Sequence, residues 1–220
     1  MQRRDFSKQL AGTSLGLSLG LTVASVARAQ GGPVEGTHYV KLSTPAAVTL
    51  SSPDKKIEVV EFFWYGCPHC FAFEPILDAW ARSLPADVAF RRVPAGFSQQ
   101  YQVHQRVFYA LEELGLLESH HRLVFSAIHQ KNVRLNTDAE ITAFMVANNV
   151  DGAKFATAFK SFSVNTKATR ARQLAEAYKI DGVPALGVHG RFYTAASLAG
   201  SHERAVKVAD FLIQRARQSA

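Results

Sequence analysis

The feature that most constrains this chain is its cysteine content: Cys67 and Cys70 are the only cysteines among 220 residues. At most one internal disulfide can form, and it would close a very short loop. Closing a short loop adds little stability, because the entropic benefit of a cross-link grows with loop length. The chain is 47% hydrophobic and 20% charged, which is ordinary for a protein held together by a buried core. We therefore expect the cysteine pair to serve chemistry rather than to hold the fold together.

The pair lies in the sequence Cys67-Pro68-His69-Cys70, between a predicted buried strand at 57–63 and a predicted helix at 68–84. At a helix N-terminus the free N–H groups and the helix dipole stabilise a thiolate, here on Cys67. Pro68 suits the first helical turn, where its missing N–H costs nothing. His69 adds a second positive influence. Stabilising the thiolate stabilises the reduced form, which makes the disulfide a stronger oxidant.

Three other readings of the motif are weaker. A structural disulfide would be a poor staple at this spacing. A metal site needs three or four ligands, and only the two cysteines and His69 cluster here. Haem attachment needs a histidine directly after the second cysteine, where Phe71 stands. A redox-active dithiol is the favoured interpretation.

The remaining pattern predicts an α/β fold. Strands are expected at 39–42, 57–63, 88–93, 185–189 and 192–193, with helices at 68–84, 165–180 and 201–217. Residues 98–163 are helical almost throughout, and Thr137 with Glu140 forms a predicted capping box. A strand–helix–strand half and a helix–strand–strand–helix half can share one sheet, with a helical subdomain inserted where they join.

Residues 1–29 have the features of a cleaved secretory signal. Arg3 and Arg4 precede an apolar stretch at 10–26, and Ala27-Arg28-Ala29 matches the small-x-small pattern at which signal peptidase cuts. The stretch is short and diluted by polar and small residues, whereas a membrane-spanning helix needs about 20 mostly apolar residues. Cleavage before Gln30 is predicted. The export route, general secretory or twin-arginine, stays open.

The positive charge does not point to nucleic acid. Cleavage removes four positive charges and one negative charge, so the net charge falls from +7 to +4. No basic run with interleaved aromatic residues is present. A solvated cationic surface accounts for the charge, and no nucleic-acid partner is expected.

Two motifs carry a family resemblance. Cys67-Pro68-His69-Cys70, preceded by Glu61-Phe62-Phe63 and followed by Phe73-Glu74, is joined far downstream by Gly182-Val183-Pro184-Ala185. With the helical insert between them, these residues resemble the DsbA family of periplasmic thiol:disulfide oxidoreductases. Thioredoxins carry Gly-Pro between the cysteines, and protein disulfide isomerases carry Gly-His. The resemblance implies a thioredoxin-like α/β fold in two parts, 30–97 and 165–220, with an all-helical insertion at 98–164.

The resemblance also implies roles for individual residues. Cys67, exposed at the helix start, would be the nucleophile, and Cys70 its buried partner. Pro184 would be a cis-proline facing the pair, and Val183 would offer backbone groups to an extended substrate. Glu61 resembles the family's buried glutamate near the active site, with proton transfer as its role.

Glu61 also has an alternative interpretation, as a strand-end carboxylate that reaches solvent or Arg91. The segment Trp64-Tyr65-Gly66 varies the family's lead-in to the motif. Seven further histidines are scattered along the mature chain and are predicted to lie on the surface: His38, His104, His120, His121, His129, His189 and His202.

The expected function is that of a periplasmic dithiol oxidase that donates its disulfide to exported, folding proteins. The two sulfurs carry the electrons, so no cofactor and no metal is expected. The resemblance implies reoxidation by a DsbB-like, quinone-linked membrane oxidase, and a monomer is expected. The alternatives are a protein disulfide reductase or isomerase and, from another class, a metal-binding or peptide-binding module in which the dithiol is incidental.

Overall fold

A computed structural model describes residues 31–50 and 52–218 of the chain. The predicted signal segment 1–29 and its cleavage site lie outside these residues. From Gly32 onward the chain forms one compact unit. Within the described ranges, no helix has the length and apolar character needed to cross a membrane.

One mixed sheet forms the centre of the unit. Its strands are β1 (Val40–Lys41), β2 (Ile57–Phe63), β3 (Val88–Pro94), β4 (Ala185–Val188) and β5 (Phe192–Ala195), in the spatial order β1-β5-β4-β2-β3. β3 runs parallel to β2, and the other neighbouring pairs are antiparallel. All seven residues of β2 are buried. This burial explains why its sequence is apolar with few interruptions instead of alternating.

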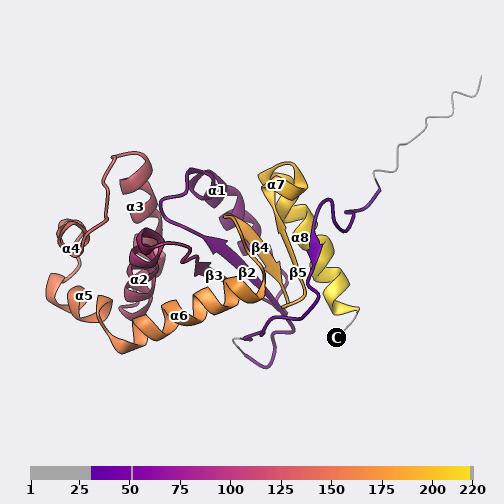
Figure 1. Cartoon of the computed structure of the whole chain (residues 1–220), viewed down its shortest axis with the longest axis horizontal. Helices are drawn as coiled ribbons and strands as arrows, with labels where there is room; N and C mark the ends of the chain where they lie inside the picture. The colour runs from indigo at the N-terminus through magenta and orange to yellow at the C-terminus, as the bar shows by residue number, and fades with distance from the viewer. Residues whose placement is uncertain (1–30, 51, 219–220) are drawn as a thin grey trace, which may run out of the picture. The chain divides into compact units, whose positions relative to one another are not determined.

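The described part of the chain contains eight helices. They are α1 (Pro68–Arg82), α2 (Gln99–Glu113), α3 (Leu117–His129), α4 (Asp138–Ala147), α5 (Gly152–Phe159), α6 (Phe162–Ala177), α7 (Ala196–Ala199) and α8 (His202–Arg217). Helices α2 to α5 gather beside the sheet, and α6 leads back from them toward it (Figure 1). The order of strands and helices along the chain, together with the mixed sheet, confirms the predicted α/β class.

One helix boundary differs from the sequence prediction, and one predicted capping motif is confirmed. α6 begins at Phe162 instead of Asn165, because the Ser161 hydroxyl caps it by accepting from the Val164 N–H at 3.1 Å. The predicted capping box is present: Thr137 Oγ1 accepts from the Glu140 N–H at 3.2 Å, and Glu140 Oε2 accepts from the Thr137 N–H at 3.0 Å. The short α7 was not predicted.

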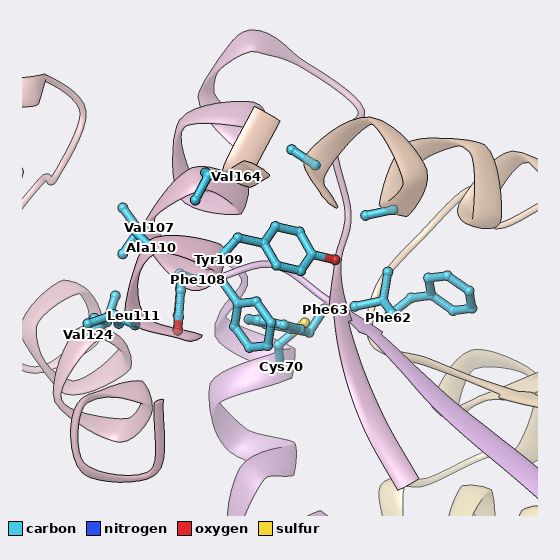
Figure 2. Packing of buried hydrophobic residues seen from close by; sticks show 14 of the residues in the cluster. Phe62, Phe63, Cys70, Val107, Phe108, Tyr109, Ala110, Leu111, Val124 and Val164 are labelled. Atoms are coloured by element: carbon cyan, nitrogen blue, oxygen red, sulfur yellow. The ribbon is translucent and has the colours of Figure 1, made fainter. Parts of the chain in front are cut away.

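The sheet divides two hydrophobic clusters. On one face, Ile57 and Val59 pack in a cluster with residues of α1 and α8. On the other face, Val60 and Phe62 belong to a cluster that extends through α2, α3 and α6. Figure 2 shows part of this second cluster, in which Cys70 is one of the labelled members. The second cysteine of the motif is therefore part of the core.

Three histidines correct the prediction that all seven lie on the surface: His104, His120 and His121 are buried. His104 Nε2 bonds the Leu135 carbonyl at 3.1 Å, and His120 Nε2 bonds the Asn148 carbonyl at 3.1 Å. These bonds offset part of the loss of water around each ring, and His104 Nδ1 stays without a hydrogen-bond partner in the described residues. A single sequence does not reveal such partners, because they lie 28 or more positions away along the chain.

Packing at Gly187 gives a stability prediction. A Cβ at this position in β4 would lie 2.5 Å from the Tyr178 ring, and the Tyr178 hydroxyl is fixed by the Gly190 N–H at 2.7 Å. Gly187→Ala is expected to lower the free energy of unfolding by about 1–3 kcal/mol, the usual cost of overpacking. Chemical denaturation measures it. Gly182→Ala is the matched control, since a Cβ there meets nothing within 4 Å, and equal stability of the two variants would contradict the prediction.

Candidate active site

Cys67 is the N-cap of α1 and joins the end of the β2 segment to the helix. Its backbone is extended, with φ −87° and ψ 115°, and Pro68 fills the first helical position. The Cys67 sulfur accepts the Cys70 backbone N–H at 3.2 Å. The sulfur thus takes the place of the oxygen that caps most helices, at the positive end of the helix dipole.

The two thiols have opposite acidities. Both are free in the structure. The pKa of Cys67 is lowered to about 6, first by the hydrogen bond from the Cys70 thiol, and then by the backbone N–H groups of Cys70 and His69 and the positive influence of His69, against the opposing effect of burial. The pKa of Cys70 is raised, chiefly by burial. At neutral pH the reduced pair therefore consists of a thiolate on Cys67 and a thiol on Cys70.

Cys67 is less open than predicted. Only 6% of the residue is exposed, which corrects the expectation of an exposed sulfur at the helix start. A loop from the far half of the sheet contributes to this covering: the Cys67 sulfur lies 3.4 Å from the Val183 carbonyl oxygen, to which the thiol donates when it is protonated. The Val183–Pro184 peptide bond is cis. His69, by contrast, is exposed, and so is Pro68.

A hollow of about 560 Å³ opens beside this loop. Its lining includes His69 of the motif, Val183 and Pro184 of the loop, and Tyr193, Leu198 and His202 from the C-terminal part of the chain. His202, which sequence reasoning assigned only to the surface, stacks on Phe73 of α1 at 4.9 Å between ring centroids. The sequence spacing of Phe73 does not predict this contact, because the two residues come together only when α1 and α8 pack against each other.

Glu61 is fully buried, with no exposed area. Its ion-pair partner is Arg92, whose Nε lies 3.1 Å from Glu61 Oε2. This corrects the alternative in which Glu61 reaches solvent or Arg91. Arg91 instead pairs with Glu58 at 2.8 Å, because residues 58 and 61 of a strand point to opposite faces of the sheet.

Burial, followed by the charge of Glu74, raises the pKa of Glu61 well above its usual range. The charge of Glu61 in turn contributes to the raised pKa of Cys70. The carboxyl group and the buried thiol are therefore electrostatically coupled, although no hydrogen bond joins them in the part of the chain that is described.

The lead-in segment has its own packing. The Trp64 indole stacks on Tyr101 of α2 at 3.9 Å between centroids. A Cβ at position 66 would lie 2.3 Å from the indole ring, so only glycine fits directly before Cys67. The Tyr65 carbonyl accepts from His129 Nε2 at 2.8 Å. The aromatic variation noted in the sequence thus fixes the approach of β2 to the motif.

A parallel β-α-β unit with a dithiol at the N-terminus of its helix, facing a cis-proline loop on the neighbouring antiparallel strand, defines a thioredoxin-fold thiol:disulfide oxidoreductase. Within residues 31–50 and 52–218 no group of three or more potential ligands is arranged to hold a metal ion.

Comparison with known proteins agrees with this class. A family model described as "DSBA-like thioredoxin domain" matches residues 84–204, beyond the cysteine pair. The chain is 43% identical to the thiol:disulfide interchange protein DsbA of Pseudomonas aeruginosa, covering 84% of this chain and 86% of that protein. It is 42% identical to DsbA of Azotobacter vinelandii, covering 96% and 95%. The chain belongs to the DsbA family and is a thiol:disulfide oxidoreductase.

Solved structures agree as well. A crystal structure of Pseudomonas aeruginosa DsbA superposes with a TM-score of 0.78 at 43% identity, covering 84% of this chain and 94% of that one. DsbA from Xylella fastidiosa superposes with a TM-score of 0.77 at 31% identity, covering 84% and 98%. The thioredoxin-like fold is therefore confirmed.

The cap geometry predicts the acidity of Cys67. Absorbance of the thiolate at 240 nm should report a titration near pH 6 in the reduced protein. Cys70→Ala removes the strongest stabilising donor, so the midpoint should rise toward the ordinary value for a cysteine, about 8.5. Cys70→Ser keeps a hydroxyl donor and should remain closer to the wild type. An unchanged midpoint in Cys70→Ala would show that the Cys70 side chain does not stabilise the thiolate.

Proposed function

We propose that this protein is a periplasmic dithiol oxidase, which transfers the Cys67–Cys70 disulfide to exported proteins as they fold. The observation that carries the proposal is the Cys67 sulfur at the N-terminus of α1, where it accepts the Cys70 N–H at 3.2 Å and its pKa is lowered to about 6. A stabilised thiolate belongs only to the reduced form, so it drives the pair toward reduction and its partners toward oxidation. The same thiolate is also the better leaving group when a substrate is released.

The proposed reaction has two exchange steps. A substrate thiolate attacks the Cys67 sulfur, the S–S bond to Cys70 breaks, and a mixed disulfide forms. Cys70 leaves as a thiolate and takes up a proton. A second substrate thiolate then attacks the substrate sulfur of the mixed disulfide, and Cys67 leaves as the stabilised thiolate. Two electrons have moved from the substrate dithiol to the pair, and the substrate has gained one disulfide.

We propose that Glu61 supplies the proton that Cys70 takes up and accepts it again during reoxidation. The support is its complete burial, its raised pKa and its electrostatic coupling to Cys70. A buried thiolate has no water to protonate it, and a neutral carboxylic acid is a donor that burial itself favours.

Substrate binding is proposed for the loop and hollow beside the cysteines. An extended polypeptide would meet the backbone of Val183 next to Pro184, with its cysteine at Cys67. The hollow of about 560 Å³ lies on this side of the pair, and it is large enough for side chains that flank the substrate cysteine. Backbone recognition suits unfolded chains, since it does not depend on their sequence.

The compartment and partners follow from the family and the predicted signal. We propose export to the periplasm with removal of residues 1–29, unfolded or folding exported proteins as substrates, and a monomer as the working form. The reduced pair would be reoxidised by a DsbB-like membrane oxidase that passes electrons to quinone.

The oxidase proposal is tested with the purified protein in its disulfide form and a reduced, unfolded polypeptide that carries two cysteines. The substrate should lose two thiols for each molecule of the oxidised protein that becomes reduced. Cys67→Ser should abolish this transfer. The reduction potential of the pair should be well above that of thioredoxin, about −270 mV. A potential at or below that value would favour a reductase and contradict the oxidase. If the substrate keeps its thiols but binds the wild type and Cys67→Ser equally well, the protein is a binding module instead.

The role of Glu61 is tested by Glu61→Gln. Loss of the proton donor should slow the step in which Cys70 leaves, which stopped-flow kinetics of mixed-disulfide formation can measure, by roughly 10²-fold or more. The midpoint of the Cys67 titration should not change, since Glu61 is absent from the principal causes of its acidity. Glu58→Gln is the matched control, because Glu58 is also buried in β2 but pairs with Arg91. Equal rates in both variants would argue against proton transfer by Glu61.

A further inference from the structure

A group of buried charges lies between the sheet and helices α1 and α3. Glu61 comes from β2, Arg92 from β3, Glu74 from α1 and His121 from α3, and each is buried except Arg92, whose side chain is 18% exposed. Asp78 of α1 joins the group at 2.6 Å from Arg92. Three carboxyl groups therefore surround the Arg92 guanidinium, and Arg122, on the surface, reaches only Asp78, at 3.9 Å. Full ionisation of all three would leave unbalanced negative charge in the interior.

Arg92 does not serve the carboxyl groups equally. Its Nη2 donates to Glu74 Oε2 at 3.2 Å and to Asp78 Oδ1 at 2.6 Å, and its Nε donates to Glu74 Oε1 at 3.4 Å. Arg92 Nε also lies 3.1 Å from Glu61 Oε2, and this ion pair lowers the pKa of Glu61. The contact is outside hydrogen-bond geometry, however, and neither oxygen of Glu61 has a hydrogen-bond partner in the described residues. Glu74 therefore accepts the charge-assisted hydrogen bonds that stabilise an ionised carboxylate, whereas Glu61 accepts none.

His121 adds a second donor to Glu74. Its Nε2 lies 3.3 Å from Glu74 Oε1, and its Nδ1 lies 2.9 Å from the Tyr65 hydroxyl. With the proton on Nε2, His121 donates to the carboxylate and accepts the Tyr65 O–H, so every group has a partner. With the proton on Nδ1 alone, a lone pair would face the carboxylate, and Glu74 itself would have to carry a proton. The arrangement therefore favours the Nε2–H form with Glu74 charged, because in the other form the Tyr65 hydroxyl would accept from Nδ1 and lose His121 as the acceptor for its own proton.

We propose that His121 is a positioning residue for the redox reaction: its Nε2–H keeps the Glu74 carboxylate charged and bonded to Arg92, so that the proton shared by the buried group resides on Glu61, beside Cys70. His121 touches neither cysteine and acts only through Glu74.

The acidities agree with this division. His121 and Arg92 together lower the pKa of Glu74 against the effect of burial, while burial and the charge of Glu74 raise the pKa of Glu61 against the lowering effect of Arg92. Burial lowers the pKa of His121 itself, which leaves the ring neutral. The titratable and charged groups that face the group from the surrounding elements are Tyr65 after β2, Arg92 of β3, Cys70, Glu74 and Asp78 of α1, and His121 and Arg122 of α3.

The consequence for the reaction rests on the proposed role of Glu61. A donor to Cys70 must carry its proton before the disulfide opens, and His121 ensures that the proton is there. Removing His121 should let Glu74 take up the proton. Arg92 would then balance only Glu61 and Asp78, without the charge of Glu74 beside them, and Glu61 would become ionised at a lower pH.

The test compares His121→Leu with His121→Gln. The NMR signal of the Glu61 carboxyl carbon is followed in the reduced protein as the pH is changed. It is assigned as the signal that disappears in Glu61→Gln. In His121→Leu the proton affinity of Glu61 should fall about tenfold or more, which is a fall of about one pH unit in the midpoint. In His121→Gln, which keeps an N–H donor, it should stay near the wild-type value. An unchanged midpoint in the leucine variant, or an equal fall in both variants, would overturn the proposal.

A measurement on the wild type covers the case in which His121→Leu does not fold. The ¹⁵N shifts of the His121 ring report which nitrogen carries the proton. A proton on Nε2 at neutral pH is expected, and a ring protonated on Nδ1 alone would overturn the proposal. These are equilibrium measurements and do not depend on oxidase activity. If the oxidase assay fails while Glu61 titrates as expected, the proposed function is lost and this inference stands.

Discussion

The hydrogen bond from the Cys70 backbone to the Cys67 sulfur, at 3.2 Å, is the contact on which the rest of the site depends. It makes a sulfur the cap of α1, so the helix is completed best when that sulfur is negatively charged. Folding and redox chemistry are thereby joined, because the contact that begins the helix also favours the reduced form. The depth of Cys70 in the core then gives the two sulfurs their different acidities.

Near this pair, the fold buries charged side chains, and removing a charge from water is energetically costly. β2 and β3 run parallel, and their register sets Glu61 opposite Arg92. α1 carries both the cysteine motif and Glu74, one turn beyond Cys70, so the same helix links the thiol to the buried carboxylates. Buried groups of this kind are weak contributors to stability. Their arrangement here is easier to understand as control over where a proton resides.

Much of this could be predicted from the sequence. The cysteine spacing, the uninterrupted strand before it and the proline within it are local features, and they indicated the redox dithiol and the α/β class. The Thr137 capping box was also local and was predicted correctly. The partner of Glu61 was not, because Arg91 and Arg92 are adjacent in sequence and only strand register decides which one faces it. The buried histidines were misjudged for a similar reason, since their partners are remote carbonyls and carboxylates.

By itself, the sequence determined that this chain can form at most one internal disulfide, that the cysteine pair lies where a strand gives way to a helix, and which family the chain resembles. Only the tertiary structure decided that Val183 approaches the Cys67 sulfur, that His202 stacks beside the motif, and that His121, Glu74 and Arg92 form one buried group with Glu61. The physical reason is the separation along the chain over which each interaction acts. Capping and helix dipoles act within a turn of the chain, whereas burial, ion pairing and proton sharing depend on which distant segments the core brings together.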